Sequence, residues 1–392
     1  MRTFAEWVLP GHPDKISDRI ADRLVEDALA RDADALVGIE VAIHRDHVFV
    51  DGRIACPTAE EIPVDRIVRD VFRESGYGER FAPHPDRLTV LTDLCLGDFR
   101  PEEREIRKIS DDQNIVTGYA EWNPATNHLP IAAYVARTFA ECLDEARREK
   151  VDAFGPDGKT LAVVRSGTAN GAARHVVEAC SCSIHHDPAI GTVEIIALAK
   201  AAFAEAQERL RRAFVERGEG STIASADHAL TVNGAGDFAV GGPEGDNGLA
   251  GKKLVVDAYG PHVPIGGGAL SGKDPHKIDR AIALRARQIA KHLVIAGVTE
   301  RALVHLAFAP GDELPRWADV QFGHVSPETG TLTWTPADRA LQDRWLAGYD
   351  CSIAGTFRDF GLARIPWSQL AAWGHFWDPK LPWERWSPGG SP

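Results

Sequence analysis

The chain has 392 residues, of which 44% are hydrophobic, and it carries a formal net charge of −13. This length and apolar content allow a large core and predict two or three domains. The negative charge argues against nucleic acid or an anionic membrane as the main partner. No apolar run approaches the ~20 residues of a membrane span, and the N-terminus lacks a signal-peptide pattern, so we expect a cytoplasmic protein.

Helical periodicity and strand-like runs alternate along the sequence. Helices are expected at about 14–31, 64–74, 131–148, 198–217, from Pro275 to a stop at Gly297, and at 337–358. Strands are expected at 35–43, 47–50, 89–93, 160–165, 229–232, 253–256 and 302–309, some joined by tight turns such as Asp51-Gly52. Long loops are expected at 96–110 and 261–273. This mixture favours an α+β fold with mixed or antiparallel sheets over a doubly wound parallel sheet.

The six cysteines are too sparse for a disulfide scaffold in a chain of this length, and none form a Cys-x-x-Cys pair. Cys180 and Cys182 are separated by one residue. We interpret them as alternate residues of a strand, in preference to metal ligands.

The most informative motif is the run from Gly266 to Asp279, which combines four glycines, two lysines and two aspartates. Glycines let the backbone approach a ligand, and the free N–H groups of a helix start attract anions. The Asp274-Pro275 pair is expected to cap this helix, so that Lys273 and Lys277 can neutralise phosphate oxygens and Asp279 can bind magnesium. The run is not a complete Walker A loop, because Asp274 stands where serine or threonine is required. A capped surface helix is the alternative.

Two other motifs have the same character. Residues 11–15, Gly-His-Pro-Asp-Lys, mark the start of the first helix, where His12 could donate to a phosphate oxygen and Asp14 could bind a second magnesium ion. An ordinary capped helix explains the same residues. Residues 241–253 hold five glycines and end in two lysines, which fits a ligand loop or a hairpin. Phe238 is suited to stacking on a base or to the core, and Lys159 follows a turn signal typical of a solvated lysine.

Together and in this order, these motifs resemble the methionine adenosyltransferases, also called S-adenosylmethionine synthetases, over nearly the whole chain. Further matches lie at 112–113, 118–120, 156–159, 259–260, 374–376 and 382–384. The resemblance implies three similar, interleaved α+β domains, which we place at 1–98, 111–233 and 234–386, with a gate loop at 99–110. The Pro/Gly/Ser-rich residues 387–392 are expected to form a disordered tail. It also implies a homodimer or homotetramer with active sites at the subunit interface.

The resemblance further implies a reaction in which the sulfur of methionine attacks C5′ of ATP, triphosphate leaves, and the triphosphate is hydrolysed to pyrophosphate and phosphate. Such a reaction needs alignment and charge stabilisation, and no serine or cysteine nucleophile. The residues expected to be catalytic are His12, Lys159, Lys253 and Lys273. Those expected to contact ATP or the amino acid are Glu6, Arg53, Asp112, Asp157, Phe238, Asp246, Lys252, Ala269 and Lys277. Asp14 and Asp279 are the expected Mg²⁺ ligands, and Glu40 is the expected K⁺ ligand.

The sequence departs from the family's pattern on the amino acid side of the site. Arg53 stands where the family has a glutamate for the ammonium group of methionine, and a guanidinium there would repel a cation and attract an anion. Residues 96–100, Leu-Gly-Asp-Phe-Arg, replace the family's Gln-Ser-Pro-Asp-Ile in a shorter gate loop. Lys252 replaces an arginine, Leu270 a phenylalanine and Asp237 a cation. The alternatives are therefore adenosyl transfer to another small nucleophile, or an ATP-binding homologue without catalysis.

Overall fold

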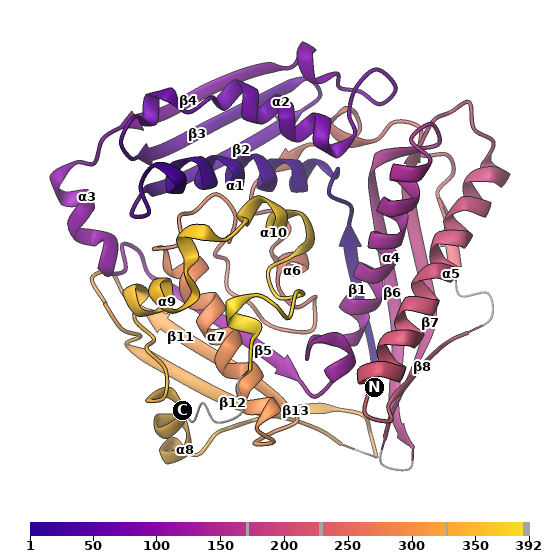
Figure 1. The fold of residues 1–392 in the computed structure, drawn as a ribbon. Coiled ribbons are helices and arrows are strands. Elements are labelled where there is room, and N and C mark those ends of the chain that lie inside the picture. Colours follow the sequence, from indigo (N-terminus) through magenta and orange to yellow (C-terminus); the bar gives the residue numbers. More distant parts are fainter. Residues whose placement is uncertain (170–171, 227–229, 327, 387–392) are drawn as a thin grey trace.

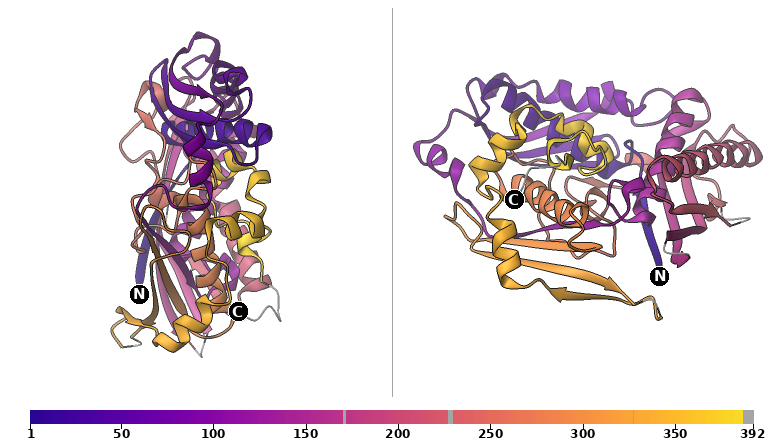
Figure 2. Two further views of the ribbon diagram at one scale, coloured as in Figure 1. Left: turned by 90° about the vertical axis from the view of Figure 1, so that its left-hand side faces the viewer. Right: turned by 60° about the horizontal axis from the view of Figure 1, so that its bottom comes forward.

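Three β-sheets surround a centre filled by helices and by the C-terminal segment (Figure 1). The computed structural model describes residues 1–169, 172–226, 230–326 and 328–386, so the tail predicted at 387–392 lies outside the described residues. Strands lie towards one side of the molecule and most helices towards the other (Figure 2). No helix in the described part of the chain is long and apolar enough to cross a membrane.

Each sheet combines strands that are far apart in the sequence. The first sheet contains β1 (Arg2–Val8), β6 (Phe154–Ala169), β7 (Ala172–His186), β8 (Thr222–Ser225) and β9 (Leu230–Val232). The second contains β10 (Gly248–Leu249), β2 (Leu36–His44), β3 (His47–Ala55) and β4 (Thr89–Gly97), and the third contains β13 (Leu332–Pro336), β12 (Trp317–Val325), β11 (Arg301–Phe308) and β5 (Asn114–Glu121). Most pairs are antiparallel, but β3–β4, β7–β8 and β7–β9 are parallel. The predicted α+β fold with mixed sheets is confirmed, whereas the linear domain boundaries remain predictions.

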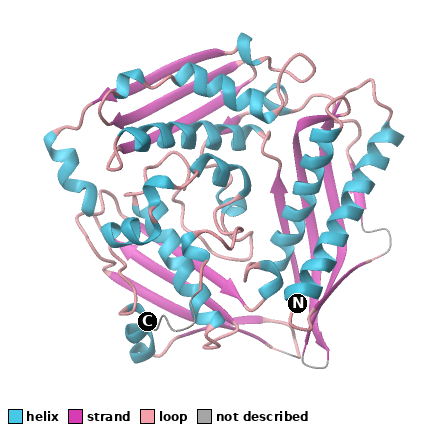
Figure 3. Ribbon diagram, viewed as in Figure 1, coloured by secondary structure: helices cyan, strands magenta, loops and turns pink. Residues whose placement is uncertain are grey.

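Helices cover one face of each sheet (Figure 3). Their bounds are α1 (Pro13–Arg31), α2 (Val64–Ser75), α3 (Pro101–Glu105), α4 (Ile131–Glu149), α5 (Thr192–Arg217), α6 (Leu254–Asp257), α7 (Ile278–Ile295), α8 (Arg339–Leu346), α9 (Ile353–Phe360) and α10 (Trp367–Trp373). Helix α1 packs on β2, α4 on β1 and β6, and α7 on β5 and β11. The apolar positions Ile16, Ile20 and Leu24 that predicted α1 are all buried.

Helix α1 is buried on its polar side as well, because α10 packs against it from the centre of the molecule. Asp14, Asp18 and Asp22 have no exposed surface. Buried carboxylates are costly unless they are paired or hydrogen-bonded. These three carboxylates therefore need hydrogen-bond or charge partners from the segments packed around α1.

Four local predictions were wrong. Residues 254–257 form helix α6, whereas a strand was expected at 253–256, since the run of three apolar residues at 254–256 is too short for strand propensity to outweigh tertiary contacts. Asp51 and Gly52 lie inside β3, where Gly52 has φ +119° and a side chain would strike the carbonyl of Gly38. The predicted helix at 337–358 is divided into α8 and α9, and α7 begins at Ile278 after an N-cap at Lys277.

Candidate active site

His12 lies at the N-cap of α1, directly before Pro13 in the first turn, as the sequence predicted. The backbone N–H of Asp14 donates to Nδ1 of His12 at 3.2 Å, which assigns the ring proton to Nε2. Burial, reinforced by the charges of Lys159 and Lys253, lowers the pKa of His12 to about 3. The imidazole is therefore neutral at physiological pH and has an Nε2–H donor to offer.

Asp14 connects the start of α1 to the loop at 241–253. Its carboxylate accepts from Nζ of Lys253 at 2.7 Å and from the N–H of Leu249 at 3.0 Å, and Nζ of Lys252 lies 3.6 Å away. Burial alone would raise the pKa of Asp14, but these hydrogen bonds outweigh it and lower the pKa below its ordinary value. An ionised carboxylate is thus held among three cation or N–H donors.

The same face of α1 holds both glycine-rich loops through carboxylates four residues apart. Asp18 accepts from the N–H of Gly251 at 2.7 Å, and Asp22 accepts from the N–H of Gly272 at 2.9 Å. One turn further, Glu26 accepts from the N–H of Ser368 at 2.8 Å. Residues at i and i+4 share a helix face, so this spacing was visible in the sequence. Sequence reasoning nevertheless missed Asp18, Asp22 and Glu26.

Two buried cations complete this row of carboxylates. Arg280 donates from Nη2 to both oxygens of Asp22, at 2.6 and 2.8 Å. Lys15 lies between Asp18, at 3.1 Å, and Asp257 of α6. Burial raises the pKa of Asp257 to about 7, whereas the two carboxylates beside Lys15 raise the pKa of the ammonium group. The buried side chains between α1 and the two glycine-rich loops therefore form a network of paired charges.

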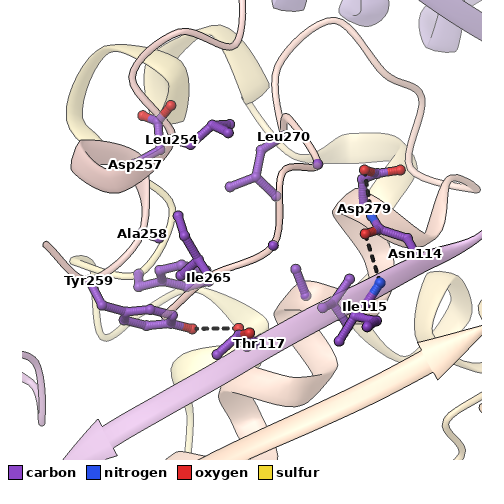
Figure 4. Close-up of a pocket in the computed structure, with 15 residues that line it drawn as sticks. Asn114, Ile115, Thr117, Leu254, Asp257, Ala258, Tyr259, Ile265, Leu270 and Asp279 are labelled. Atoms are coloured by element: carbon purple, nitrogen blue, oxygen red, sulfur yellow. Dashed lines mark hydrogen bonds between the residues drawn. The ribbon is translucent and has the colours of Figure 1, made fainter. Parts of the chain in front are cut away.

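The loop at 266–279 places Lys273 and Asp279 together. Nζ of Lys273 lies 2.8 Å from Oδ1 of Asp279, and Asn114 of β5 donates to the same oxygen at 2.7 Å (Figure 4). Gly268 packs so closely on Asp279 and Asn114 that a Cβ would overlap them. Ala269 packs against Gly251, so the two loops lie against each other. A cleft beside Asn114 and Asp279 extends to Tyr259 and is lined by Leu270 (Figure 4).

A cavity of about 310 Å³ lies beside the first residues of β6. Its lining includes Asp157, Lys159, Ser183, Asn233, Asp237 and Phe238. Oδ2 of Asp157 accepts from the N–H of Gly242 at 2.8 Å, while Oδ1 is buried and has no partner among the described residues. Burial raises the pKa of Asp157 to about 6, and the charge of Asp246 acts in the same direction. Three of the predicted ATP-contacting or catalytic residues, Asp157, Lys159 and Phe238, thus line this cavity.

Arg53 is fully engaged with the segment that follows β4. Its Nε and Nη2 donate to the two oxygens of Glu103, at 3.1 and 3.0 Å, and further bonds reach the carbonyls of Cys95 and Asp98. The guanidinium charge is therefore balanced by Glu103, a residue that sequence reasoning did not single out.

Of the remaining predicted residues, Glu6, Glu40 and Asp112 are exposed and Lys277 is half-buried. Glu6 is exposed on β1, and its strand partner Leu161 is two residues along β6 from Lys159. Glu40 is exposed on β2 opposite Asp51, with the charge of Lys273 near it. Among the described residues, the carboxylate of Asp112 accepts only from the adjacent N–H of Gln113. Lys277 pairs with Asp111.

The fold and these loops define an α+β protein with two glycine-rich loops held against one buried helix. Family models for the N-terminal and C-terminal domains of S-adenosylmethionine synthetase match residues 2–95 and 240–385. The S-adenosylmethionine synthase of Desulforudis audaxviator is 34% identical, covering 97% of this chain and 95% of the relative. Those of Corynebacterium urealyticum and Clostridium botulinum are 32% and 31% identical, with 97% of this chain and 95% and 96% of the relatives covered. The chain belongs to the S-adenosylmethionine synthetase family.

Proposed function

We propose that this chain is a methionine adenosyltransferase, a transferase that makes S-adenosylmethionine from ATP and methionine. The sulfur of methionine forms a bond to C5′ of ATP while the C5′–O bond breaks, and triphosphate leaves with the electron pair. The triphosphate is then hydrolysed to pyrophosphate and phosphate. The observation that carries the proposal is that α1 brings His12, Asp14 and both glycine-rich loops to one place.

The proposed roles follow from the charge that develops on the leaving group. Nε2–H of neutral His12 donates to an oxygen of the departing triphosphate, while Lys159, Lys253 and Lys273 stabilise its negative charge. Because Lys253 and Lys273 are paired with aspartates, they are held in place before substrate binds. Asp157 and Phe238 are proposed to contact the nucleoside end of ATP, in the cavity beside the first residues of β6.

Metal ions are generally used in this family, and we propose Mg²⁺ at Asp14 and Asp279. Within the described residues, no three His, Cys, Asp or Glu side chains are grouped to hold a metal, and each of these aspartates offers one carboxylate. Magnesium is usually bound by one or two carboxylates together with waters and substrate phosphates, so this donor set fits an ion that arrives with ATP. When bound, it would neutralise phosphate charge. Glu40, opposite Asp51, is the proposed K⁺ ligand.

We favour methionine over an acidic acceptor because the charge of Arg53 is already neutralised and so does not attract an extra acidic group. Its guanidinium is bidentate with Glu103, and the pair is electrically neutral. Glu6, Asp112, Asp246, Lys252, Ala269 and Lys277 remain proposed substrate contacts.

We propose that the chain assembles as a homodimer or homotetramer through the open faces of its sheets. Large apolar side chains are exposed on strands of all three sheets, namely Phe4, Phe49, Leu91, Ile115, Leu161 and Trp317. On the second sheet Phe49 and Leu91 are paired neighbours, and exposed apolar patches often mark protein–protein interfaces. All six cysteines are free, which fits a reducing compartment, and the cytoplasm remains our proposal.

The test is incubation of the purified protein with ATP, MgCl₂ and KCl, with and without methionine, followed by mass spectrometry. We expect S-adenosylmethionine only when methionine is present. A panel of acidic thioethers replaces methionine in parallel reactions. Triphosphate release with an acidic acceptor but not with methionine, or no turnover with any acceptor, would overturn the proposal.

A further inference from the structure

Residues 98–111 form a strap that runs from the end of β4 to the start of β5 and contains helix α3. The sequence predicts a gate loop here, rich in charge and poor in apolar residues. The strap is held at both ends by arginines. Arg53 holds its first part through Glu103 and the carbonyl of Asp98, and Arg107 holds its last part.

Arg107 reaches from the strap into the loop that carries the phosphate lysines. The residue is 6% exposed, its Nε donates to the carbonyl of Asp34 at 3.1 Å, and Nη2 donates to the carbonyl of Ala35 at 2.9 Å. The same Nη2 forms an ion pair with Asp274, which has no exposed surface. A planar guanidinium can satisfy these three acceptors at once, whereas an ammonium group cannot do so with the same geometry.

Asp274 joins three parts of the fold. Its second oxygen accepts from the N–H of Val37 in β2 at 2.7 Å, and its first also accepts from the N–H of His276 at 2.9 Å. Lys273 precedes Asp274 directly, and Lys277 donates its backbone N–H to the carbonyl of Asp274 at 3.1 Å. Any shift of this carboxylate therefore moves the backbone of both lysines.

We propose that Arg107 is a positioning residue of the phosphate site, which fixes Lys273 and Lys277 by holding the buried carboxylate of Asp274. The inference deepens the proposed function and rests on it, because it assigns a role toward the triphosphate. The Arg107–Asp274 pair also connects the strap to the loop at 266–279, so we expect the two segments to move together. The Asp111–Lys277 pair is a second connection between them.

The test compares Arg107→Gln with Arg104→Gln as a matched control. Arg104 lies on the same strap, but its side chain is 59% exposed, stacks on Phe99, and lies 4.0 Å from its nearest carboxylate, Asp32. Calorimetry measures the Kd for sodium tripolyphosphate with MgCl₂, and steady-state kinetics give the KM values for ATP and for methionine. Arg107→Gln is expected to raise the tripolyphosphate Kd and the KM for ATP by roughly tenfold to a hundredfold, since small misplacements of charged groups have effects of this size. The KM for methionine and all values for Arg104→Gln are expected to stay within about twofold of wild type, because exposed pairs contribute little.

Arg107→Lys keeps the charge and is expected to recover part of the affinity, so it also decides the matter if Arg107→Gln fails to fold. An unchanged tripolyphosphate Kd in either folded variant would overturn the inference, as would a parallel rise of both KM values. A wild-type protein that binds tripolyphosphate but forms no S-adenosylmethionine would contradict the proposed function instead. In that case the calorimetric comparison still tests Arg107.

Discussion

The two halves of the candidate site are constructed differently. On the phosphate side, three fully buried aspartates at four-residue spacing on α1 hold the backbone of two glycine-rich loops. On the side of the strap, the structure depends on side-chain pairs between distant segments, and the Arg53–Glu103 pair is partly exposed. The first half is therefore specified by a local pattern on one helix. The second half depends on partners that only the fold brings together.

This comparison predicts different consequences of mutation on the two sides. A change among the buried carboxylates leaves a charge without its partner in the interior, which is costly. A change in a partly exposed pair has a small effect on the free energy of unfolding. Its main effect is on the position of the strap.

Asp22→Asn is expected to lower the free energy of unfolding by about 3–5 kcal/mol, because Arg280 is fully buried and Asp22 is its only hydrogen-bonded side-chain partner among the described residues. Urea denaturation followed by circular dichroism measures the loss. Asp27→Asn on the same helix is the control, since its pair with Arg31 is at the surface and should cost under about 1 kcal/mol. Similar losses for the two variants would contradict the difference between buried and exposed carboxylates.

Lys273→Ala is expected to lower kcat on the order of 10²–10³-fold, because a fixed charge at the leaving triphosphate is removed. Steady-state formation of S-adenosylmethionine measures the effect, and thermal unfolding checks that the variant is folded. The matched control is Lys200→Ala, an exposed lysine of α5. Turnover near wild type in folded Lys273→Ala would remove this residue from the site.

His185 packs against Gly155 and Gly241, its ring lies 5.7 Å from that of Phe238, and burial lowers its pKa to about 4. The unfolded chain binds this proton near pH 6.5 and the folded protein does not, so stability is present above pH 6.5 and is lost as the pH falls towards 4. The loss from His185 at pH 5.5 is expected to be about 1.4 kcal/mol. The free energy of unfolding is measured at pH 7.5 and at pH 5.5. Its decrease between the two should be smaller by this amount in His185→Gln than in the wild type, and the exposed His47→Gln serves as the control. Equal pH dependence in all three proteins would refute the assignment.

Arg53→Glu is expected to raise the KM for methionine by roughly fivefold, because a partly exposed pair is worth about 1 kcal/mol or less. From the sequence alone we expect the opposite, since removing a guanidinium should favour a cationic substrate. The pair with Glu103 reverses that expectation, because a glutamate introduced at position 53 would face a second carboxylate. Kinetics of Arg53→Glu and of the charge swap Arg53→Glu/Glu103→Arg measure this, and the swap should restore the KM. A lower KM in the single variant would support exclusion of methionine by Arg53.

Much of the framework could be predicted from the sequence. The apolar spacing of Ile16, Ile20 and Leu24 predicted α1, and Pro13 marked its first turn correctly. The alternate Cys180 and Cys182 lie on β7, as interpreted. These features depend on neighbours within one element, so local rules are sufficient for them.

Features that depend on distant contacts were missed. Strand β5 was not predicted, and the structure pairs it with β11, almost two hundred positions away. In the sequence, Arg107 is one of several charged residues in a loop. Only the fold shows that it forms an ion pair with Asp274. The spacing of Asp14, Asp18 and Asp22 was visible, but a charged stripe on a helix usually faces solvent. Only the packing of α10 on α1 explains why this one is buried.

The most direct test of the account is the stoichiometry of a single turnover, followed by ³¹P NMR and mass spectrometry, with ATP, methionine, MgCl₂ and KCl. We predict that each ATP consumed yields one S-adenosylmethionine, one pyrophosphate and one phosphate. Formation of ADP or AMP, or consumption of ATP without S-adenosylmethionine, would contradict attack at C5′ with departure of the whole triphosphate.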